Sequence, residues 1–155
     1  MNIFKQEKAI TLVSLMITVI LLFILAGVSI TIGTGQMKTV NDSKLTSELE
    51  MVQHAVLEQY IKYKTTKDKV YLVGNKITKE EASSAASEMG VTLTNIPDTY
   101  KDKDYYRLDK ASLTAMGIQE VSNEYIINYI SGEVMNITVK KTSRNKPLYA
   151  IANNF

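Results

Sequence analysis

Histidine, cysteine and clustered carboxylates are the residues with which a chain of this size would most readily do chemistry. His54 is the only histidine, and the chain has no cysteine. An enzyme site needs a positioned nucleophile or an acid–base pair, whereas His54 stands among the surface positions of a predicted helix. We therefore assign His54 a structural or solvated role, and expect no catalytic residue and no enzymatic activity.

Three aspartates, Asp102, Asp104 and Asp109, are the best candidates for metal ligands. A calcium loop of the EF-hand type needs a glycine at its sharp turn and a glutamate at its last ligand position. The sequence around these aspartates lacks both. We expect this stretch to be a solvated connector, with no metal site and no cofactor.

A basic run near the C-terminus is the third candidate. It consists of Lys140, Lys141, Arg144 and Lys146, and no acidic residue follows Glu133. Such a run is usually a solvated strand end, and the functional alternative is contact with DNA, an anionic surface or an acidic face of a neighbour. Nucleic-acid binding is weakly supported, because from Lys38 onward acidic and basic residues nearly balance, in a chain whose net charge is +2.

The element that must position everything else is an apolar stretch near the N-terminus. Between Lys8 and Lys38 there is no charged residue, and residues 10–32 are mostly Ile, Leu, Val and Phe. As a helix they would cover roughly 34 Å, against a hydrocarbon core of about 30 Å. Lys5 and Lys8 place residues 1–9 in the cytoplasm and the chain after Ile32 outside.

Three roles are possible for this stretch. It is a plain membrane anchor, or a secretory signal peptide cut near Gly27–Ser29, or a helix that packs against other helices. The third is favoured by a polar seam of small residues, which suits close contact between helices in lipid. The seam consists of Thr11, Ser14, Thr18 and Ser29, which share one helical face.

The run Lys8–Val13, followed by the apolar stretch, resembles the N-terminal signature of type IV pilins and pseudopilins. The resemblance implies that a prepilin peptidase cuts after Ala9 and that Ile10 becomes the methylated N-terminus. The family's Thr-Leu pair is present as Thr11 and Leu12. The chain departs from the family at Ala9, where glycine is usual, and at Ser14, where most pilins have a glutamate that neutralises a neighbour's N-terminal amine.

The resemblance implies a structural subunit, major or minor, that leaves the membrane to join an extracellular filament of the type IV pilus or type II secretion kind. Its partners would be the prepilin peptidase and other pilin subunits. Residues 125–134, YIINYISGEV, also resemble a C-terminal hairpin of small pilin-like proteins from Gram-positive bacteria. The alternatives are a single-pass anchored domain that does not polymerise and a freely secreted protein.

Residues 33–64 are predicted to continue the helix beyond the membrane. Their apolar residues recur at spacings of three and four, as in a helix with one buried stripe. The stripe consists of Leu45, Leu49, Val52 and Val56, followed by Tyr60 and Tyr63. Gly33 and Gly35 weaken the start of this segment, because glycine costs about 1 kcal/mol in a helix relative to alanine.

Residues 65–155 are predicted to form one extracellular α+β domain. A strand is expected at Val70–Val73, and a helix capped by Thr78 and stopped by Gly90. Further on we expect a strand at Tyr105–Leu108, a short helix at Asp109–Met116, and a hairpin of Glu124–Ile130 with Glu133–Val139 around a two-residue Ser131-Gly132 turn. A long first helix packed on a small C-terminal antiparallel sheet fits the pilin fold.

Overall fold

The computed structural model describes residues 15, 18, 39–101 and 103–152 of the chain. The chain divides into two compact units, Met1–Asn41 and Asp42–Phe155. The predicted leader 1–9 lies outside the described residues, as do Ala9, Ile10, Thr11, Ser14, Ser29 and residues 33–38. In the first unit Leu15 and Thr18 are helical, and the Thr18 hydroxyl donates a 2.8 Å hydrogen bond to the Leu15 carbonyl.

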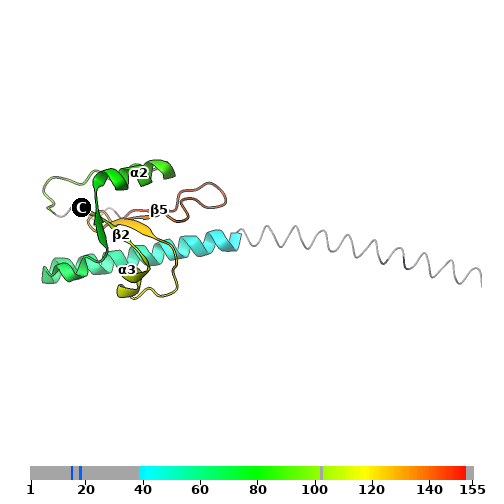
Figure 1. The fold of residues 1–155 in the computed structure, drawn as a ribbon, viewed down its shortest axis with the longest axis horizontal. Coiled ribbons are helices and arrows are strands. Elements are labelled where there is room, and N and C mark those ends of the chain that lie inside the picture. The colour runs from blue at the N-terminus through cyan, green and yellow to red at the C-terminus, as the bar shows by residue number, and fades with distance from the viewer. Residues whose placement is uncertain (1–14, 16–17, 19–38, 102, 153–155) are drawn as a thin grey trace, which may run out of the picture. The chain divides into compact units, whose positions relative to one another are not determined.

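A long helix runs through residues 39–66 (Figure 1). Pairs of opposite charge four residues apart support its exposed side, with Lys62 Nζ lying 2.7 Å from the Glu58 carboxylate. The helix ends where Lys67 takes a left-handed backbone conformation at φ 62° and its N–H donates back to the Tyr63 carbonyl at 2.7 Å. This reversal turns the chain back toward the body of the domain.

The prediction of a strand at Val70–Val73 is wrong. Residues Lys69–Tyr71 form a 3-10 turn, η1, because the Asp68 side chain accepts a 3.0 Å hydrogen bond from the Val70 N–H and bends the backbone. The strand β1 follows at Asn75–Ile77. Gly74, at φ 113°, allows the change of direction, since a Cβ there would stand 2.8 Å from Leu108 Cδ2.

The sheet has five antiparallel strands in the order β1-β2-β3-β4-β5. The strands after β1 are β2 (Tyr105–Leu108), β3 (Tyr125–Asn128), β4 (Glu133–Asn136) and β5 (Tyr149–Ala150). Each strand pairs with the next one along the chain, so the sheet is a meander. The prediction of an α+β domain with one helix packed on a small antiparallel sheet is confirmed.

The predicted hairpin exists, but its turn is longer and its strands are shorter than expected. Four residues, 129–132, connect β3 to β4 in place of the two-residue turn. The cause is Asn128, whose side-chain oxygen accepts hydrogen bonds from the N–H groups of Ile130 at 2.9 Å and Ser131 at 3.0 Å. These bonds offer the backbone an alternative to the ladder and end β3 early.

Both short helices form where their capping residues predict. Helix α2 spans Lys79–Met89, with a capping box between Thr78 and Glu81 and a left-handed Gly90 at its end. Helix α3 spans Lys110–Ala115, and the Asp109 carboxylate accepts a 2.8 Å bond from the Ser112 N–H. These caps are local in sequence, which is why sequence reasoning placed them correctly.

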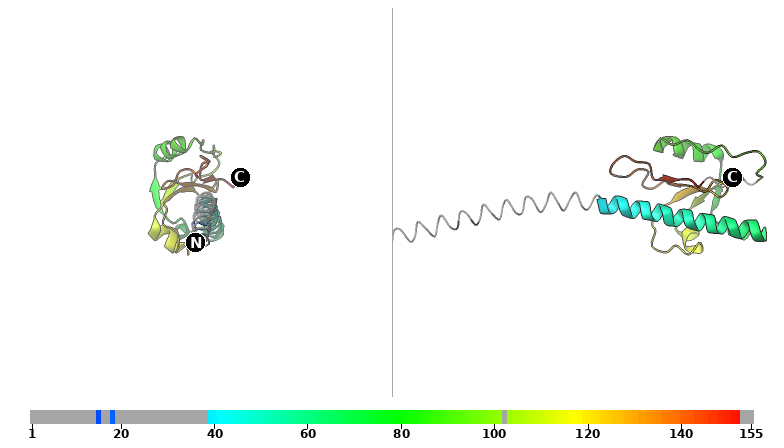
Figure 2. Two further views of the ribbon diagram at one scale, coloured as in Figure 1. Left: turned by 90° about the vertical axis from the view of Figure 1, so that its right-hand side faces the viewer. Right: turned by 180° about the vertical axis from the view of Figure 1, so that it is seen from behind.

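The sheet is covered on both faces (Figures 1 and 2). The long helix and α3 contribute to one hydrophobic cluster with Tyr125, Ile127 and Val134 of the sheet. Helix α2 packs through Ala82, Ala86 and Met89 in a second cluster, with Ile126 and Met135. Among the described residues, no helix combines the length and the apolar character needed to cross a lipid bilayer.

Candidate functional site

One side of the long helix is buried against the sheet. Leu45, Leu49, Val52 and Val56 are at most 7% exposed and belong to the same cluster as Tyr125, Ile127 and Val134. Gln53 adds a polar tie, because its side-chain amide donates a 3.0 Å hydrogen bond to the Gly132 carbonyl in the β3–β4 connection. The helix is therefore held to the sheet along several turns.

The opposite side of the long helix carries large apolar side chains in the open. Met51 is 50% exposed and Ile61 is 64% exposed. At 100° per residue they lie about 80° apart on the helix, on the side away from Leu49 and Val56. Beside Ile61, a shallow hollow is lined also by Leu57, Tyr60 and Lys64. Met51, Ile61 and the half-buried Leu57 are the apolar side chains that the sheet leaves uncovered here, and we call these three the outer strip; the exposed His54 and Glu58 share this side of the helix.

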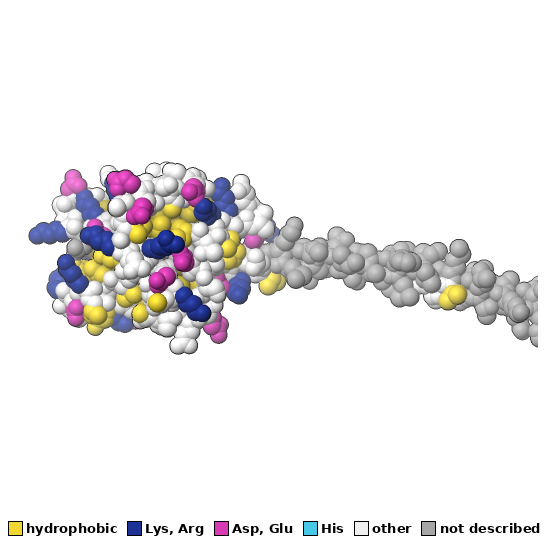
Figure 3. Space-filling model, in the orientation of Figure 1, with side chains coloured by type: hydrophobic (Ala, Val, Ile, Leu, Met, Phe, Trp, Pro, Cys, Tyr) yellow, Lys and Arg dark blue, Asp and Glu magenta, His cyan; other side chains and the backbone are white. Residues whose placement is uncertain are grey.

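On the face of this unit that Figure 3 shows, charges of both signs are interspersed. Arg107 and Glu124 pair across β2 and the start of β3, and Lys76 Nζ lies 2.7 Å from the Asp104 carboxylate. Surface pairs of this kind stabilise a domain by about 1 kcal/mol or less. The face seen in Figure 3 is not given over to one sign of charge.

A buried carboxylate, Glu133, organises the face of the sheet opposite the long helix. Its side chain accepts four hydrogen bonds: from the Thr94 N–H at 2.7 Å, the Ser131 hydroxyl at 2.7 Å, the Tyr149 hydroxyl at 2.9 Å and the Tyr105 hydroxyl at 3.1 Å. Burial, followed by the nearby Glu133 charge, raises the pKa of Tyr149 to about 12 and raises that of Tyr105 further. One carboxylate thus joins β2, β4, β5 and the 91–104 connector.

A second polar group lies beneath the long helix. Asn123 donates a 3.1 Å hydrogen bond to the Glu48 carboxylate, whose side chain is 12% exposed. The Asn136 amide nitrogen, on the strand beside Tyr125, is buried and has no hydrogen-bond partner among the described residues. Burial raises the pKa of Tyr125 to about 12, and the Glu48 charge adds to the effect.

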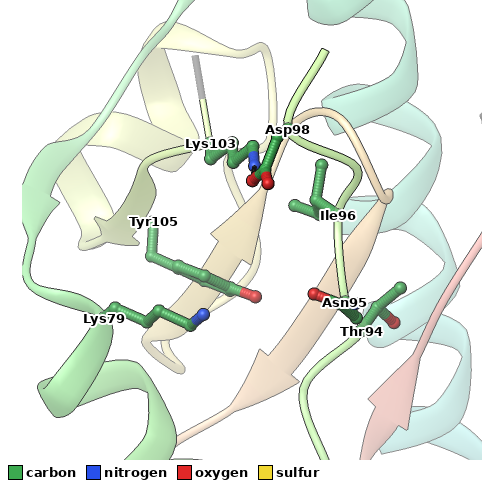
Figure 4. Close-up of a pocket in the computed structure, with 7 residues that line it drawn as sticks. All are labelled: Lys79, Thr94, Asn95, Ile96, Asp98, Lys103 and Tyr105. Atoms are coloured by element: carbon green, nitrogen blue, oxygen red, sulfur yellow. Dashed lines mark hydrogen bonds and ion pairs between the residues drawn. The ribbon is translucent and has the colours of Figure 1, made fainter. Parts of the chain in front are cut away.

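A small pocket lies between the 91–104 connector and the start of α2 (Figure 4). Its polar groups are largely engaged: Lys103 Nζ lies 2.5 Å from the Asp98 carboxylate, and the Tyr105 hydroxyl donates to Glu133. The Lys103 hydrogen bond lowers the pKa of Asp98. The pocket holds about 120 Å³, so it suits a few water molecules rather than an organic substrate.

The residues first considered for chemistry lie apart. His54 is exposed on the long helix, Asp104 pairs with Lys76, and Asp109 caps α3. Asp102 lies outside the described residues. Across the described ranges, no three His, Cys, Asp or Glu side chains gather in a way that would hold a metal ion.

The basic run forms an ordered loop rather than a frayed tail. We call residues 140–147 the basic loop. Lys140 pairs with Glu88 of α2, and Lys141 forms an isolated bridge with Pro147. The loop is tied to the long helix, because Asp42 accepts a 2.8 Å bond from the Ser143 N–H and a 2.6 Å bond from its hydroxyl. These two bonds lower the pKa of Asp42.

Sequence reasoning missed Glu133 and Asp42. Glu133 reads as the ordinary first residue of a strand, and the one hint is the hydroxyl of Ser131 two residues before it. Asp42 reads as a solvated helix residue, and nothing in the sequence points to Ser143. We found no match to this chain among protein-family models, curated proteins or solved structures.

Proposed function

We propose that this chain is a pilin-like structural subunit, matured by a prepilin peptidase, held in the membrane by residues 10–32 and then assembled into an extracellular filament. The observation that carries the proposal is the long helix, which the sheet covers on one side only. Met51 and Ile61 remain open to water on the other side. Apolar side chains left open on a helix that follows an apolar stretch in the sequence are suited to packing against like helices.

The second support is the N-terminal sequence. Lys8–Val13 resembles the processing signature of pilins, and the chain holds no charge between Lys8 and Lys38. Ser14 departs from the family, because a hydroxyl brings no negative charge to a neighbour's N-terminal amine. An unpaired buried amine costs several kcal/mol, so we assign the chain to a minor position beside subunits that carry the glutamate.

Maturation is expected to depend on Ala9. Ala9→Arg should leave an uncut precursor, because a bulky charged side chain has little room in a peptidase site at the membrane face. Ala9→Gly, the matched control, should be cut at least as well as the natural chain. Mass spectrometry of the N-terminus reads the result directly. Normal maturation of Ala9→Arg would show that the resemblance to pilins misleads.

Filament incorporation is expected to depend on the outer strip. Ile61→Glu and Met51→Glu, singly and together, should reduce incorporation at least tenfold, because each places a charge where an apolar contact forms. Stability should change by no more than about 0.5 kcal/mol, since both side chains are exposed. Filaments sheared from cells and quantified by immunoblot give the measurement.

Val70→Glu is the matched control for the outer strip. Val70 is 69% exposed and apolar, as Ile61 is, but it lies in η1 rather than on the long helix. Incorporation should be unchanged by this substitution. Equal losses from Val70→Glu and Ile61→Glu would argue against a helix-mediated assembly, and a processed chain that never enters filaments would leave the anchored, non-polymerising domain as the function.

A further inference from the structure

We propose that the basic loop, residues 140–147, contacts the anionic headgroups of the membrane that holds the chain before assembly. The inference rests on the proposed function, because it requires residues 10–32 to be in a bilayer. It adds an interaction surface and the chemistry of its partner, a lipid surface of negative charge. The argument uses the order of the loop, its charges and its place in the chain.

The loop is a tight hairpin with its own hydrogen bonds. The Thr142 N–H donates to the Lys146 carbonyl at 2.8 Å, and the Asn145 N–H donates to the Thr142 carbonyl at 3.0 Å. Asn145 takes the left-handed conformation, at φ 60°, that such a tight turn requires. The backbone between Lys141 and Pro147 is therefore fixed, and the cationic side chains extend from a defined surface.

Three cations of the loop form no ion pair within the part of the chain that the structure describes: Lys141, and the exposed Arg144 and Lys146. Lys140 is engaged with Glu88, and Asp42, whose oxygens are bonded to Ser143, lies near enough to Arg144 for their charges to attract. Each Lys or Arg near an anionic surface strengthens attachment by roughly fivefold.

The tie to Asp42 sets the position of the loop along the chain. Ser143 is bonded to Asp42, which follows the end of the apolar stretch at Ile32 by ten residues. Those ten residues span about 15 Å as a helix and no more than about 35 Å fully extended. Headgroups reach about 5–8 Å beyond the hydrocarbon, and charges act over a further 8 Å or so.

With these ten residues in a helix, the spacing of about 15 Å matches that reach, so the inference takes a helical spacing between Ile32 and Asp42. Figure 1 shows the loop running beside the long helix toward the end at which that helix begins, and the reverse view in Figure 2 agrees. DNA is a less suitable partner for the loop than an anionic lipid surface, because three cations in a chain of net charge +2 are few for binding a polyanion. A second copy of the chain is the remaining occupant, and the experiment separates it from lipid.

The absence of cysteine allows a single reporter to be placed by substitution. Pro147→Cys places a fluorophore at the base of the loop, and Thr65→Cys places one about 34 Å farther along the helix from Asp42. The full chain is reconstituted into phosphatidylcholine vesicles with or without phosphatidylglycerol, each with an energy-transfer acceptor on the headgroups. We expect stronger transfer from position 147 in the anionic vesicles, loss of the difference at high salt, and little change at position 65.

Charge reversal tests the side chains. Lys141→Glu, Arg144→Glu and Lys146→Glu together should abolish the dependence on phosphatidylglycerol. The matched control reverses three exposed lysines elsewhere, Lys69, Lys101 and Lys110, and should preserve it. Transfer that is equal in both vesicle types, or that falls equally in both triple variants, overturns the inference.

Insertion is measured separately, by resistance of the vesicle-bound chain to alkaline extraction. If the chain inserts but energy transfer from position 147 is the same with and without phosphatidylglycerol, the inference is overturned and the proposed function stays intact. A chain that does not insert overturns both. A reporter that responds to protein concentration or to added duplex DNA, rather than to lipid composition, assigns the loop to a second copy or to nucleic acid and overturns the lipid contact.

Discussion

Replacing Glu133 with leucine is expected to destabilise residues 42–155 by about 3–5 kcal/mol. The substitution keeps a side chain of similar volume but removes the acceptor of four hydrogen bonds, which leaves the buried donor of Tyr105 and the part-buried donors of Tyr149 and Thr94 without their partner. Because a domain of this size is stabilised by about 5–15 kcal/mol in total, much of the folded population should be lost on mild heating. Urea unfolding followed by circular dichroism measures the change.

Glu124→Leu is the matched control. Glu124 stands at the start of β3 and pairs with Arg107, but both side chains are partly exposed. Its loss should cost no more than about 1 kcal/mol. Similar midpoints for the Glu133 and Glu124 variants would mean that the donors around Glu133 find other partners, and that this carboxylate does not hold the four segments together.

The same cluster predicts a loss of stability at high pH. The pKa of Tyr149 is raised to about 12, first by burial and then by Glu133, from an unfolded value near 10. A raised pKa in the folded state means that the stabilisation is fully present below about pH 10 and is lost as the pH rises toward 12. Urea midpoints should therefore be flat up to about pH 9 and fall above pH 10.

Leu49→Ala is expected to destabilise the same unit by about 2–4 kcal/mol, and Val52→Ala and Val56→Ala by somewhat less. Leu49 is 5% exposed and the two valines are fully buried between the long helix and the sheet. Each substitution removes apolar contact and leaves a cavity that a close-packed interface refills only in part. Urea midpoints should fall without a change in the slope of the transition.

Met51→Ala is the control for Leu49→Ala on the same helix. Met51 stands two residues away and is 50% exposed, so its truncation should change stability by no more than about 0.5 kcal/mol. The pair also separates folding from assembly, because Met51 belongs to the outer strip. Equal destabilisation at the two positions would show that the helix is covered on both sides, and would remove the basis for the proposed assembly surface.

Local patterns determined most of the secondary structure. The spacing of Leu45, Leu49, Val52 and Val56 predicts a one-sided helix, and the structure buries all four. Helices α2 and α3 begin where the side chains of Thr78 and Asp109 accept hydrogen bonds from backbone N–H groups three residues ahead. Helix α2 ends at Gly90, which takes a left-handed conformation and donates its N–H to a carbonyl four residues back. Such interactions need no distant partner, so they can be read from sequence alone. The apolar stretch 10–32 and the cleavage after Ala9 remain predictions.

Only the tertiary structure decided which polar residues matter. Thr94 is 39 residues from Glu133, and Asp42 is 101 residues from Ser143. No periodicity predicts such pairs, because whether a carboxylate is solvated or enclosed depends on which segments the fold brings over it. The turn at residues 129–132 and the missing strand at Val70–Val73 have a different, local cause: the side chains of Asn128 and Asp68 accept hydrogen bonds from backbone N–H groups two or three residues ahead, which the strand pattern did not reveal.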